Sequence, residues 1–198
     1  MRMLLIVFAS WILAEFYGYF LHILLHSDRF RWLSRRHMHH HLKCYGPTKK
    51  MRTTEYVQDV GDDTLILGLG LEWLIPALCL VGITALGEWA IGLSWVEILI
   101  SEAILILYSV FLFWYLHDNM HVKDVWILKV PILRKAFIKA RRDHDIHHNH
   151  FSDDGLMKKN FGIAFCFLDH IFGTYQARLG RINKKGIEAA YKRYDIKK

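Results

Sequence analysis

Long apolar runs alternate with basic segments along this chain of 198 residues, and the alternation predicts a helical membrane protein. The first run, Met3–Leu25, is interrupted only by Glu15 and His22. It is long enough to cross a hydrocarbon core, which takes about 20 residues. A signal peptide would end its apolar region after about 7–15 residues at a small-residue cleavage site. Because this run continues into a histidine pattern that recurs later, we predict a retained span.

Two further runs, Thr64–Leu86 and Trp95–Leu116, are joined by the short stretch Gly87–Ser94 and predict a helical hairpin in the membrane. Two later segments, Val125–Ile138 and Phe161–Tyr175, are apolar but too short to cross. They suit helices that lie at the membrane interface, or helices that cap a cytoplasmic core, and the pattern leaves both open. The predicted fold is an all-α, multi-pass membrane protein with about three to four spans.

The distribution of basic residues predicts which side of the membrane each segment occupies. Of 26 Lys and Arg, eight lie in Arg29–Arg52 and seventeen follow Val122, whereas Thr53–Val122 contains none. The positive-inside rule therefore places both basic segments in the cytoplasm and the N-terminus outside. The net charge of +7 favours contact with an anionic membrane surface. Nucleic acid is a poor candidate partner, because the basic residues flank apolar spans.

Metal-binding chemistry is suggested by the histidines, of which the chain has thirteen. Ten of them form four groups in the order pair, triplet, pair, triplet, with H-x-x-x-H spacing in the pairs and H-x-x-H-H spacing in the triplets. These ten are His22, His26, His37, His40, His41, His117, His121, His144, His147 and His148. The three cysteines, by contrast, are far apart and form no C-x-x-C pair, which argues against a disulfide framework or a cysteine zinc site.

The spacing of these histidines has a physical meaning. Residues i, i+3 and i+4 lie on one face of a helix, so each group can direct its imidazoles toward one point. Each group also lies at or just beyond the predicted cytoplasmic end of a span, so all four can converge at one depth. Ten imidazoles exceed the four ligands of a tetrahedral zinc site and suit two metals with five or six ligands each. Imidazole binds iron, zinc, copper or nickel, so ligand type alone leaves the metal open.

At these residues the chain resembles the fatty acid hydroxylase / sterol desaturase superfamily of integral membrane di-iron enzymes. The superfamily carries the same four histidine groups in the same order. It also has an Asn-aromatic-Gly and an Asp-x-x-Phe-Gly-Thr after the last triplet, which here are "NFG", Asn160–Gly162, and "DHIFGT", Asp169–Thr174. The resemblance implies a hydroxylase-like membrane domain over residues 1–175, followed by a basic cytoplasmic tail over residues 176–198.

The resemblance also implies an activity and a cofactor. The ten histidines would hold two iron ions, with zinc as a metal that can replace iron on isolation. The protein would then hydroxylate a fatty acyl, sterol or carotenoid lipid drawn from the bilayer, using dioxygen and electrons from a separate haem protein or ferredoxin. A desaturase that uses the same metals is the nearest alternative. A membrane metal transporter or metal-binding protein is the alternative from another class, although transporters place their ligands near the bilayer midplane.

Several other polar residues are candidates to support the ligands. Asn160 and Asp169 belong to the two motifs that follow the last triplet. His39 lies inside the first triplet and would replace a neighbour if the helix is irregular there. His150, Asp118 and Asp145 are candidates to orient ligand rings, with a solvated surface position as the alternative for each. Glu15, an acid within a span, has either a functional or a hydrogen-bonded structural role.

Overall fold

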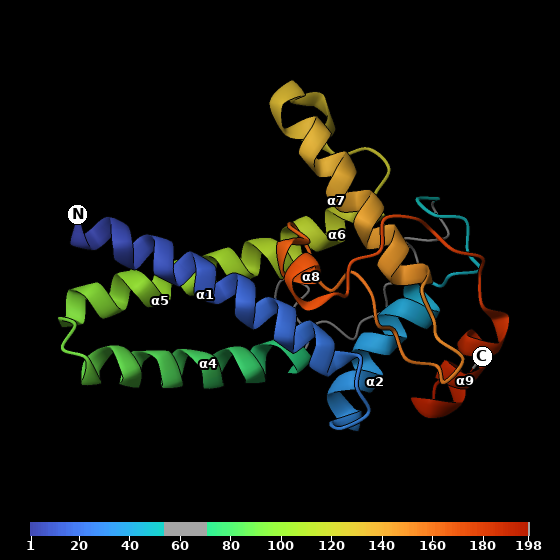
Figure 1. The fold of residues 1–198 in the computed structure, drawn as a ribbon, viewed down its shortest axis with the longest axis horizontal. Coiled ribbons are helices and arrows are strands. Elements are labelled where there is room, and N and C mark those ends of the chain that lie inside the picture. Colours follow the sequence, from blue (N-terminus) through green and yellow to red (C-terminus); the bar gives the residue numbers. More distant parts are fainter. Residues whose placement is uncertain (54–70, 198) are drawn as a thin grey trace.

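A computed structural model of the chain describes residues 1–53 and 71–197, and the statements that follow concern those residues. Their regular structure is helical apart from one isolated β-bridge between Phe151 and Met157. The long helices α1 (Arg2–Leu25), α4 (Leu71–Ala90) and α5 (Trp95–Val110) extend together to one side, with α5 in contact with both of the others. Shorter helices and the C-terminus gather at the opposite end (Figure 1).

Two helical stretches are long and apolar enough to cross a membrane. One is Arg2–Leu25, and the other is the continuous helix Trp95–His121, which runs through α5, the π-helix η3 (Phe111–Leu116) and α6 (His117–His121). The apolar part of α4, Leu74–Ala90, is shorter. The described helices thus include two candidate spans, and residues 64–70 of the predicted second run lie outside the described part of the chain.

The predicted turn Gly87–Ser94 is wrong in extent, because α4 continues to Ala90. Gly92, with a φ of 83°, takes the left-handed conformation that favours glycine just past the end of a helix. Its neighbour Leu93 donates a backbone hydrogen bond to the carbonyl of Glu88 at 3.0 Å, which closes the end of α4. Ser94 then begins α5 with a capping box that includes Glu97.

Polar side chains within the apolar helices are paired with one another across helix contacts. The Tyr108 hydroxyl of α5 donates to the Glu15 carboxylate of α1, and the Thr84 hydroxyl of α4 donates to Glu102 of α5 at 2.5 Å. Hydrogen bonds between spans stabilise helix association because no water competes for the groups in hydrocarbon. Of the two roles predicted for Glu15, functional or structural, the structure shows the hydrogen-bonded structural one.

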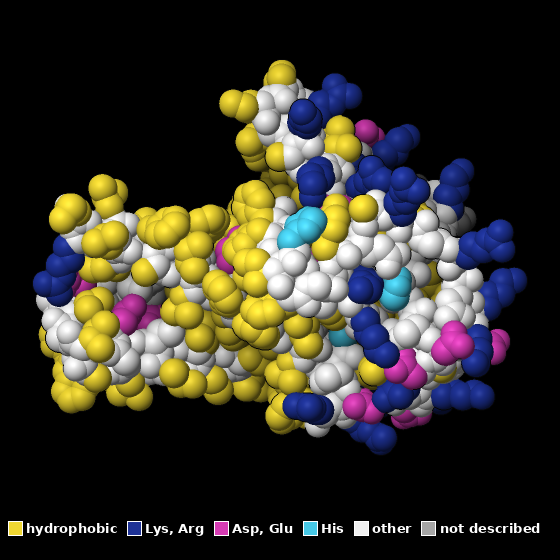
Figure 2. All heavy atoms as spheres, in the orientation of Figure 1, with side chains coloured by type: hydrophobic (Ala, Val, Ile, Leu, Met, Phe, Trp, Pro, Cys, Tyr) yellow, Lys and Arg dark blue, Asp and Glu magenta, His cyan; other side chains and the backbone are white. Residues whose placement is uncertain are grey.

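The opposite end of the molecule is assembled from short elements around the ends of α1 and α6 (Figure 1). Apolar side chains cover the long helices, whereas Lys and Arg side chains gather over this end (Figure 2). The short elements are α2 (Arg31–His39), the π-helix η1 (His40–Cys44), the 3-10 helix η4 (Trp126–Lys129), α8 (Phe167–Phe172) and α9 (Lys184–Arg193), and the longer helix α7 (Pro131–Asn149) joins them.

The two short apolar segments differ from each other in the structure. Segment 125–138 forms η4 and the first half of α7, so it begins the same helix that carries the last histidine triplet. Segment 161–175 is mostly irregular and contains only the short α8, which corrects the prediction of a helix there. Phe161 and Leu168 of this segment are buried against Tyr19 of α1, so the segment caps the core. The backbone amides of Phe161 and Gly162 donate to the carboxylate of Asp169 and take no part in a helix.

Helix α9 lies within the predicted tail and packs against the first histidine triplet's helix. Ile187, Ala190 and Tyr194 form one buried cluster with Met38 and Leu42. This cluster packs α9 against α2 and η1. Helix α9 therefore supports the histidine-bearing end of the molecule.

Gly18 allows α1 and the π-helix η3 to come into close contact. A Cβ atom placed at Gly18 would lie 2.3 Å from Cζ of the buried Phe113 ring. We expect Gly18→Ala to force Phe113 aside at a cost of about 1–3 kcal/mol in the free energy of unfolding. The measurement is the thermal unfolding midpoint of the purified protein in detergent, which should fall.

Gly82 supplies the matched control, because it is also a helical glycine in an apolar helix but a Cβ there meets nothing within 4 Å. Gly82→Ala should leave the midpoint unchanged or raise it slightly, since alanine favours helix by about 1 kcal/mol over glycine. Equal midpoints for the two variants would contradict the close approach of α1 to Phe113.

Candidate metal centre

The four histidine groups converge at the ends of α1 and α6. The first pair ends α1, the first triplet spans α2 and η1, the second pair forms α6, and the second triplet lies in the last turns of α7. Nine of the ten side chains are buried, and His40 is partly buried. The predicted convergence of all four groups is therefore observed.

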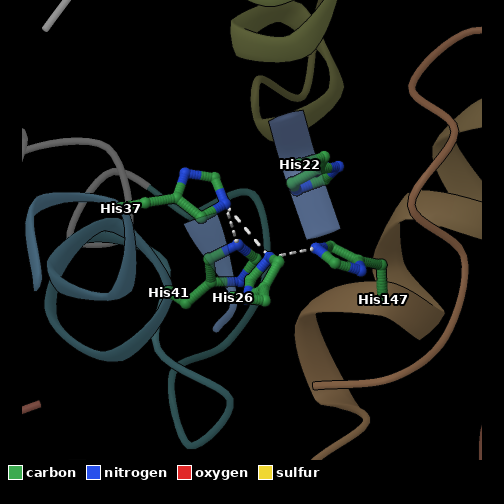
Figure 3. Close-up of side chains that lie close together, drawn as sticks. All are labelled: His22, His26, His37, His41 and His147. Atoms are coloured by element: carbon green, nitrogen blue, oxygen red, sulfur yellow. Dashed lines mark hydrogen bonds between the residues drawn. The ribbon is translucent and has the colours of Figure 1, made fainter. Parts of the chain in front are cut away.

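Five of the ten histidines form a first cluster, in which one ring nitrogen from each lies within 4.8 Å of the others. Nε2 of His26 is 3.0 Å from Nε2 of His147 and 3.1 Å from Nε2 of His37 (Figure 3). Two nitrogens about 2.1 Å from a metal and at right angles to each other lie about 3.0 Å apart. These separations therefore fit neighbouring ligands of one metal ion. The members are His22, His26, His37, His41 and His147.

A second cluster adjoins the first and consists of His40, His117, His121 and His148, again within 4.8 Å. Nε2 of His144 lies 3.1 Å from Nε2 of His121, so the tenth histidine borders this cluster. The Nε2 atoms of His40, His117 and His148 are buried, and the described residues offer them no hydrogen-bond partner. Buried polar atoms of this kind are normally satisfied, and a shared cation would satisfy all three. The donor set therefore fits a metal ion.

The two clusters are close enough to form one centre. The rings of His41, from the first cluster, and His148, from the second, stack with centroids 4.0 Å apart. Two metal ions held by these side chains would be near neighbours.

Burial keeps these imidazoles neutral. It is the main cause that lowers the pKa of His26, His37 and His41 well below the ordinary value, and neighbouring imidazoles lower it further. Burial likewise lowers the pKa of His147 to about 3. Because the neutral ring is the form that binds a metal, the site is in its ligating form at pH 7 without any proton having to leave.

Two backbone carbonyls orient ligand rings of the first cluster. Nδ1 of His147 donates to the carbonyl of Lys159 at 2.7 Å, and Nδ1 of His22 donates to the carbonyl of Phe161 at 2.6 Å. A neutral imidazole has one N–H, so these hydrogen bonds fix the proton on Nδ1 and leave Nε2 with its lone pair for a metal. The two carbonyls lie on either side of Asn160, the first residue of the "NFG" motif.

The two motifs hold this stretch of backbone in place. Asn160 is fully buried, adopts the left-handed conformation with a φ of 55°, and donates its side-chain amide to the carbonyl of Asp143 at 3.0 Å. Asp169, also fully buried, accepts hydrogen bonds from the backbone amides of Phe161 at 2.7 Å and Gly162 at 2.8 Å. Both residues therefore position the carbonyls that orient the rings, although neither touches a ring itself.

The remaining candidates occupy different positions. Asp118 lies 3.3 Å from Nδ1 of His117, as a ring-orienting carboxylate should. Asp145 instead accepts two hydrogen bonds from Arg52, at 2.5 and 2.6 Å, and so faces a cation that the sequence pattern did not indicate.

The histidines outside the ten lie at the margins of the centre. His39 is a member of neither cluster, and its Nδ1 is 3.7 Å from Sγ of Cys44, so it replaces no neighbour in the arrangement described. His150 follows the end of α7 and is partly buried. His170 is exposed on α8, where its ring lies 3.9 Å from that of Tyr175.

Two tyrosines that sequence reasoning missed support the centre. Tyr45 is buried and stacks on His121, with ring centroids 3.7 Å apart and planes 5° apart. Tyr194, just after α9, donates its hydroxyl to the backbone carbonyl of His26 at 2.6 Å. Neither residue belongs to a motif, and their proximity to the ligands arises only from the tertiary fold.

Asp169→Asn should weaken metal binding without unfolding the helices. The NH2 group of the asparagine cannot accept the hydrogen bonds that the backbone amides of Phe161 and Gly162 donate to the carboxylate. Loss of these hydrogen bonds would release the loop that orients His22. We expect metal affinity to fall about 10–100-fold, as is typical when a partner of a ligand is lost. The measurement is bound metal after a graded chelator challenge. Asp153→Asn, at an exposed carboxylate paired with Lys185, is the control and should retain metal like the parent.

Tyr194→Phe removes one hydroxyl and should lower the free energy of unfolding by about 1 kcal/mol. Tyr191→Phe is a matched comparison, because the Tyr191 hydroxyl donates at 2.8 Å to the carbonyl of Leu42, which is not a candidate ligand. We expect the two variants to lose similar thermal stability, but only Tyr194→Phe to release metal faster to a chelator. Equal release rates would show that α9 supports the fold and not the position of His26.

A match to a known protein family agrees with the arrangement of these histidines. No match was found among curated proteins or among solved structures. The sequence model of the family described as Fatty acid hydroxylase, however, matches residues 7–174, which include both histidine clusters, His144 and both motifs. This chain therefore belongs to the fatty acid hydroxylase family.

Proposed function

We propose that this protein is a membrane di-iron oxygenase that hydroxylates a lipid. The observation that carries the proposal is the convergence of nine imidazoles into two adjoining clusters, with His144 bordering the second, at the ends of apolar helices. Membership of the fatty acid hydroxylase family supports both the oxidoreductase class and a lipid substrate. In the proposed reaction, a C–H bond, dioxygen, two electrons and two protons yield a hydroxyl group and water.

In this proposal the clustered histidines hold the metal ions, and their surroundings orient the rings and exclude water. The first cluster and the second cluster with His144 would each hold one iron, and the irons would supply dioxygen activation and electron transfer. His22 and His147 keep Nε2 toward the metal because the carbonyls of Phe161 and Lys159 hold their Nδ1–H groups. The buried surroundings exclude bulk water from the reacting atoms, which protects a reactive site from side reactions.

Electrons and substrate would reach the centre from different partners. The two-electron requirement calls for a separate donor, a haem protein or a ferredoxin. The basic residues over the histidine-bearing end favour an anionic membrane surface around it (Figure 2). We place this end in the cytoplasm and the N-terminus outside, following the distribution of Lys and Arg.

A desaturase would use the same two clusters, and the ligand geometry does not separate the two reactions. We favour hydroxylation because the matching family is that of the hydroxylases. The mass of the product distinguishes them, since a gain of one oxygen atom is incompatible with desaturation and a loss of two hydrogens is incompatible with hydroxylation.

A metal transporter is the weaker alternative from another class. Transporters bind their ions near the bilayer midplane, whereas both histidine clusters lie where α1 ends and α6 begins. Metal flux into liposomes that survives substitution of His147 and His148 would contradict transport through these clusters.

His147→Ala is the direct test of the proposal. We expect protein from iron-supplied cells to contain about two irons per chain and to oxidise lipid when reduced in air. The variant should lose at least one iron and all product formation, because His147 contributes to the first cluster. Iron is measured by mass spectrometry of the purified protein, and lipid products by liquid chromatography with mass detection.

His170→Ala is the matched control, since this exposed histidine belongs to neither cluster. It should retain the iron and the activity of the parent. The proposal is wrong if well-folded parent protein binds no iron, or if His147→Ala keeps full activity.

A further inference from the structure

A cleft with a basic lining lies between the first half of α2 and the end of α9, two elements that pack against each other (Figure 1). Its volume is about 290 Å³. Three of the residues that line it are arginines, and one is a tryptophan. The lining residues are Arg31, Trp32, Arg35, Arg193, Tyr194 and Asp195. We call this space the arginine cleft.

The arginine cleft lies at the depth where the candidate span α1 ends. Tyr194, which is only 3% exposed, lines the cleft and donates its hydroxyl to the carbonyl of His26, the residue just past α1. Trp32 in the cleft and Phe30 beside it are 49% and 50% exposed. Lipid headgroups surround a span where its apolar run ends, and exposed tryptophans are typical of this interface. The position therefore favours a ligand from the membrane surface.

Two loops fix the arginine on the α9 side of the cleft. The guanidinium of Arg193 pairs with Asp28 in the loop after α1, and its Nε donates at 2.9 Å to the carbonyl of Asp154 in the loop after α7. An arginine has five N–H donors, so others remain for a ligand in the cleft. Because the guanidinium is already held, little conformational entropy is lost when it binds one.

The α2 side of the cleft carries positive charge that its neighbours do not neutralise. Arg31 and Arg35 are four residues apart, so they lie on one face of α2. The described residues give Arg31 no hydrogen-bond or ion-pair partner, and the first turn of α2 contains no acid. Arg35 is 3.7 Å from Asp195, but both side chains are largely exposed and such a pair contributes little. Like charges at this spacing repel each other, so an anion between them would stabilise α2.

We propose that the arginine cleft binds the phosphate group of an anionic membrane phospholipid. Its three arginines pair with two aspartates, Asp28 and Asp195, which leaves one positive charge to match the single negative charge of a phosphodiester. The planar guanidinium suits phosphate because two of its N–H groups reach two oxygens at once. Trp32 offers its ring to the glycerol and upper acyl carbons, which a free phosphate lacks. A lipid therefore uses more of the cleft than an inorganic anion does.

A phospholipid in this cleft would also support the metal centre. Tyr194 lines the cleft and holds the carbonyl of His26, whose ring belongs to the first cluster. A phosphate that bridges α2 and α9 would hold both elements against the end of α1. Metal should then leave the first cluster more slowly. This role differs from that of a substrate, because the lipid acts through Tyr194 and not at the ring nitrogens. The effect on metal rests on the proposed function, but binding of the lipid does not.

The double variant Arg31→Gln with Arg35→Gln removes two cations from the cleft and leaves every candidate ligand in place. Both positions are exposed, so the fold should tolerate the change. Lys123→Gln with Arg178→Gln is the matched control, because it removes the same charge at two exposed positions outside the cleft.

The experiment is native mass spectrometry of the full chain in detergent, titrated with phosphatidylglycerol, in which each bound lipid appears as a discrete increase in mass. Phosphatidylcholine with the same acyl chains and inorganic phosphate are the comparison ligands. We expect one phosphatidylglycerol to bind each chain more tightly than either. The double variant should weaken this binding about 30-fold, or about fivefold for each arginine, and the control should not. Phosphatidylglycerol should also slow the release of metal to a chelator in the parent but not in the double variant.

Three results would overturn the proposal. Equal loss of lipid in the control would show attraction by overall charge and not a site. Inorganic phosphate that binds as tightly as phosphatidylglycerol would show a site for free anions. Lipid binding that the double variant retains, while it loses reduction by an acidic electron-donor protein, would make the cleft a docking site for protein. Failure of the proposed function has a different signature, because a chain without iron would still bind phosphatidylglycerol and the double variant would still lose it.

Discussion

Ten imidazoles that face one another away from water are the constraint on which the rest of this structure depends. Each ring loses hydration on burial, and an unsatisfied buried polar group costs about 1–3 kcal/mol. Burial also keeps the rings neutral, so their lone pairs are available to a cation. No single helix supplies a cluster: the first draws on α1, on the α2–η1 segment and on α7. The fold therefore holds three separate backbones so that one ring nitrogen from each of five histidines lies within 4.8 Å of the others.

The structure meets this requirement with layers of hydrogen bonds behind the ligands. The carbonyls of Lys159 and Phe161 hold two rings, and the carboxylate of Asp169 holds the amides next to them. Hydrogen bonds to a charged group contribute about 1.5–3 kcal/mol each, more than neutral pairs. Helix α9 adds a further layer through Tyr194 and a buried apolar cluster. Residues 184–193 lie beyond the residues that the family model matches.

The sequence predicts the helical class and the ligands because both depend on local patterns. Apolar length marks α1 and the helix Trp95–His121, and the spacing of the histidines places each group on one helical face. The division of the ligands between two clusters could not be predicted, because it depends on how α1, α6 and α7 cross. The first triplet shows the difficulty: His37 and His41 join the first cluster, while His40 joins the second.

Other features could not be predicted from the sequence because they also depend on tertiary packing. The π-helices η1 and η3 adjoin the ligand groups, and wide turns of this kind often occur at functional sites, yet no residue pattern marks them. Asp145, for which the sequence left a ring-orienting role and a solvated surface position open, accepts hydrogen bonds from Arg52, which is remote in sequence. Helix α4 ends at Ala90, and the sequence does not show which of the nearby glycines, Gly87 or Gly92, takes the positive φ that follows the helix. The local sequence pattern therefore predicts the helices and the histidine groups, whereas tertiary packing determines which residues contact them.

The position of the centre reconciles two opposing demands. Polar ligands are costly in hydrocarbon, and the polar groups that do lie within the apolar helices are paired with each other. A lipid chain, in turn, is costly in water. Helix α7 joins an apolar environment to the polar one, since its first half lines an uncharged cavity and its last turns carry the second histidine triplet. A shift of this helix along its length would therefore change the cavity and the position of these imidazoles together.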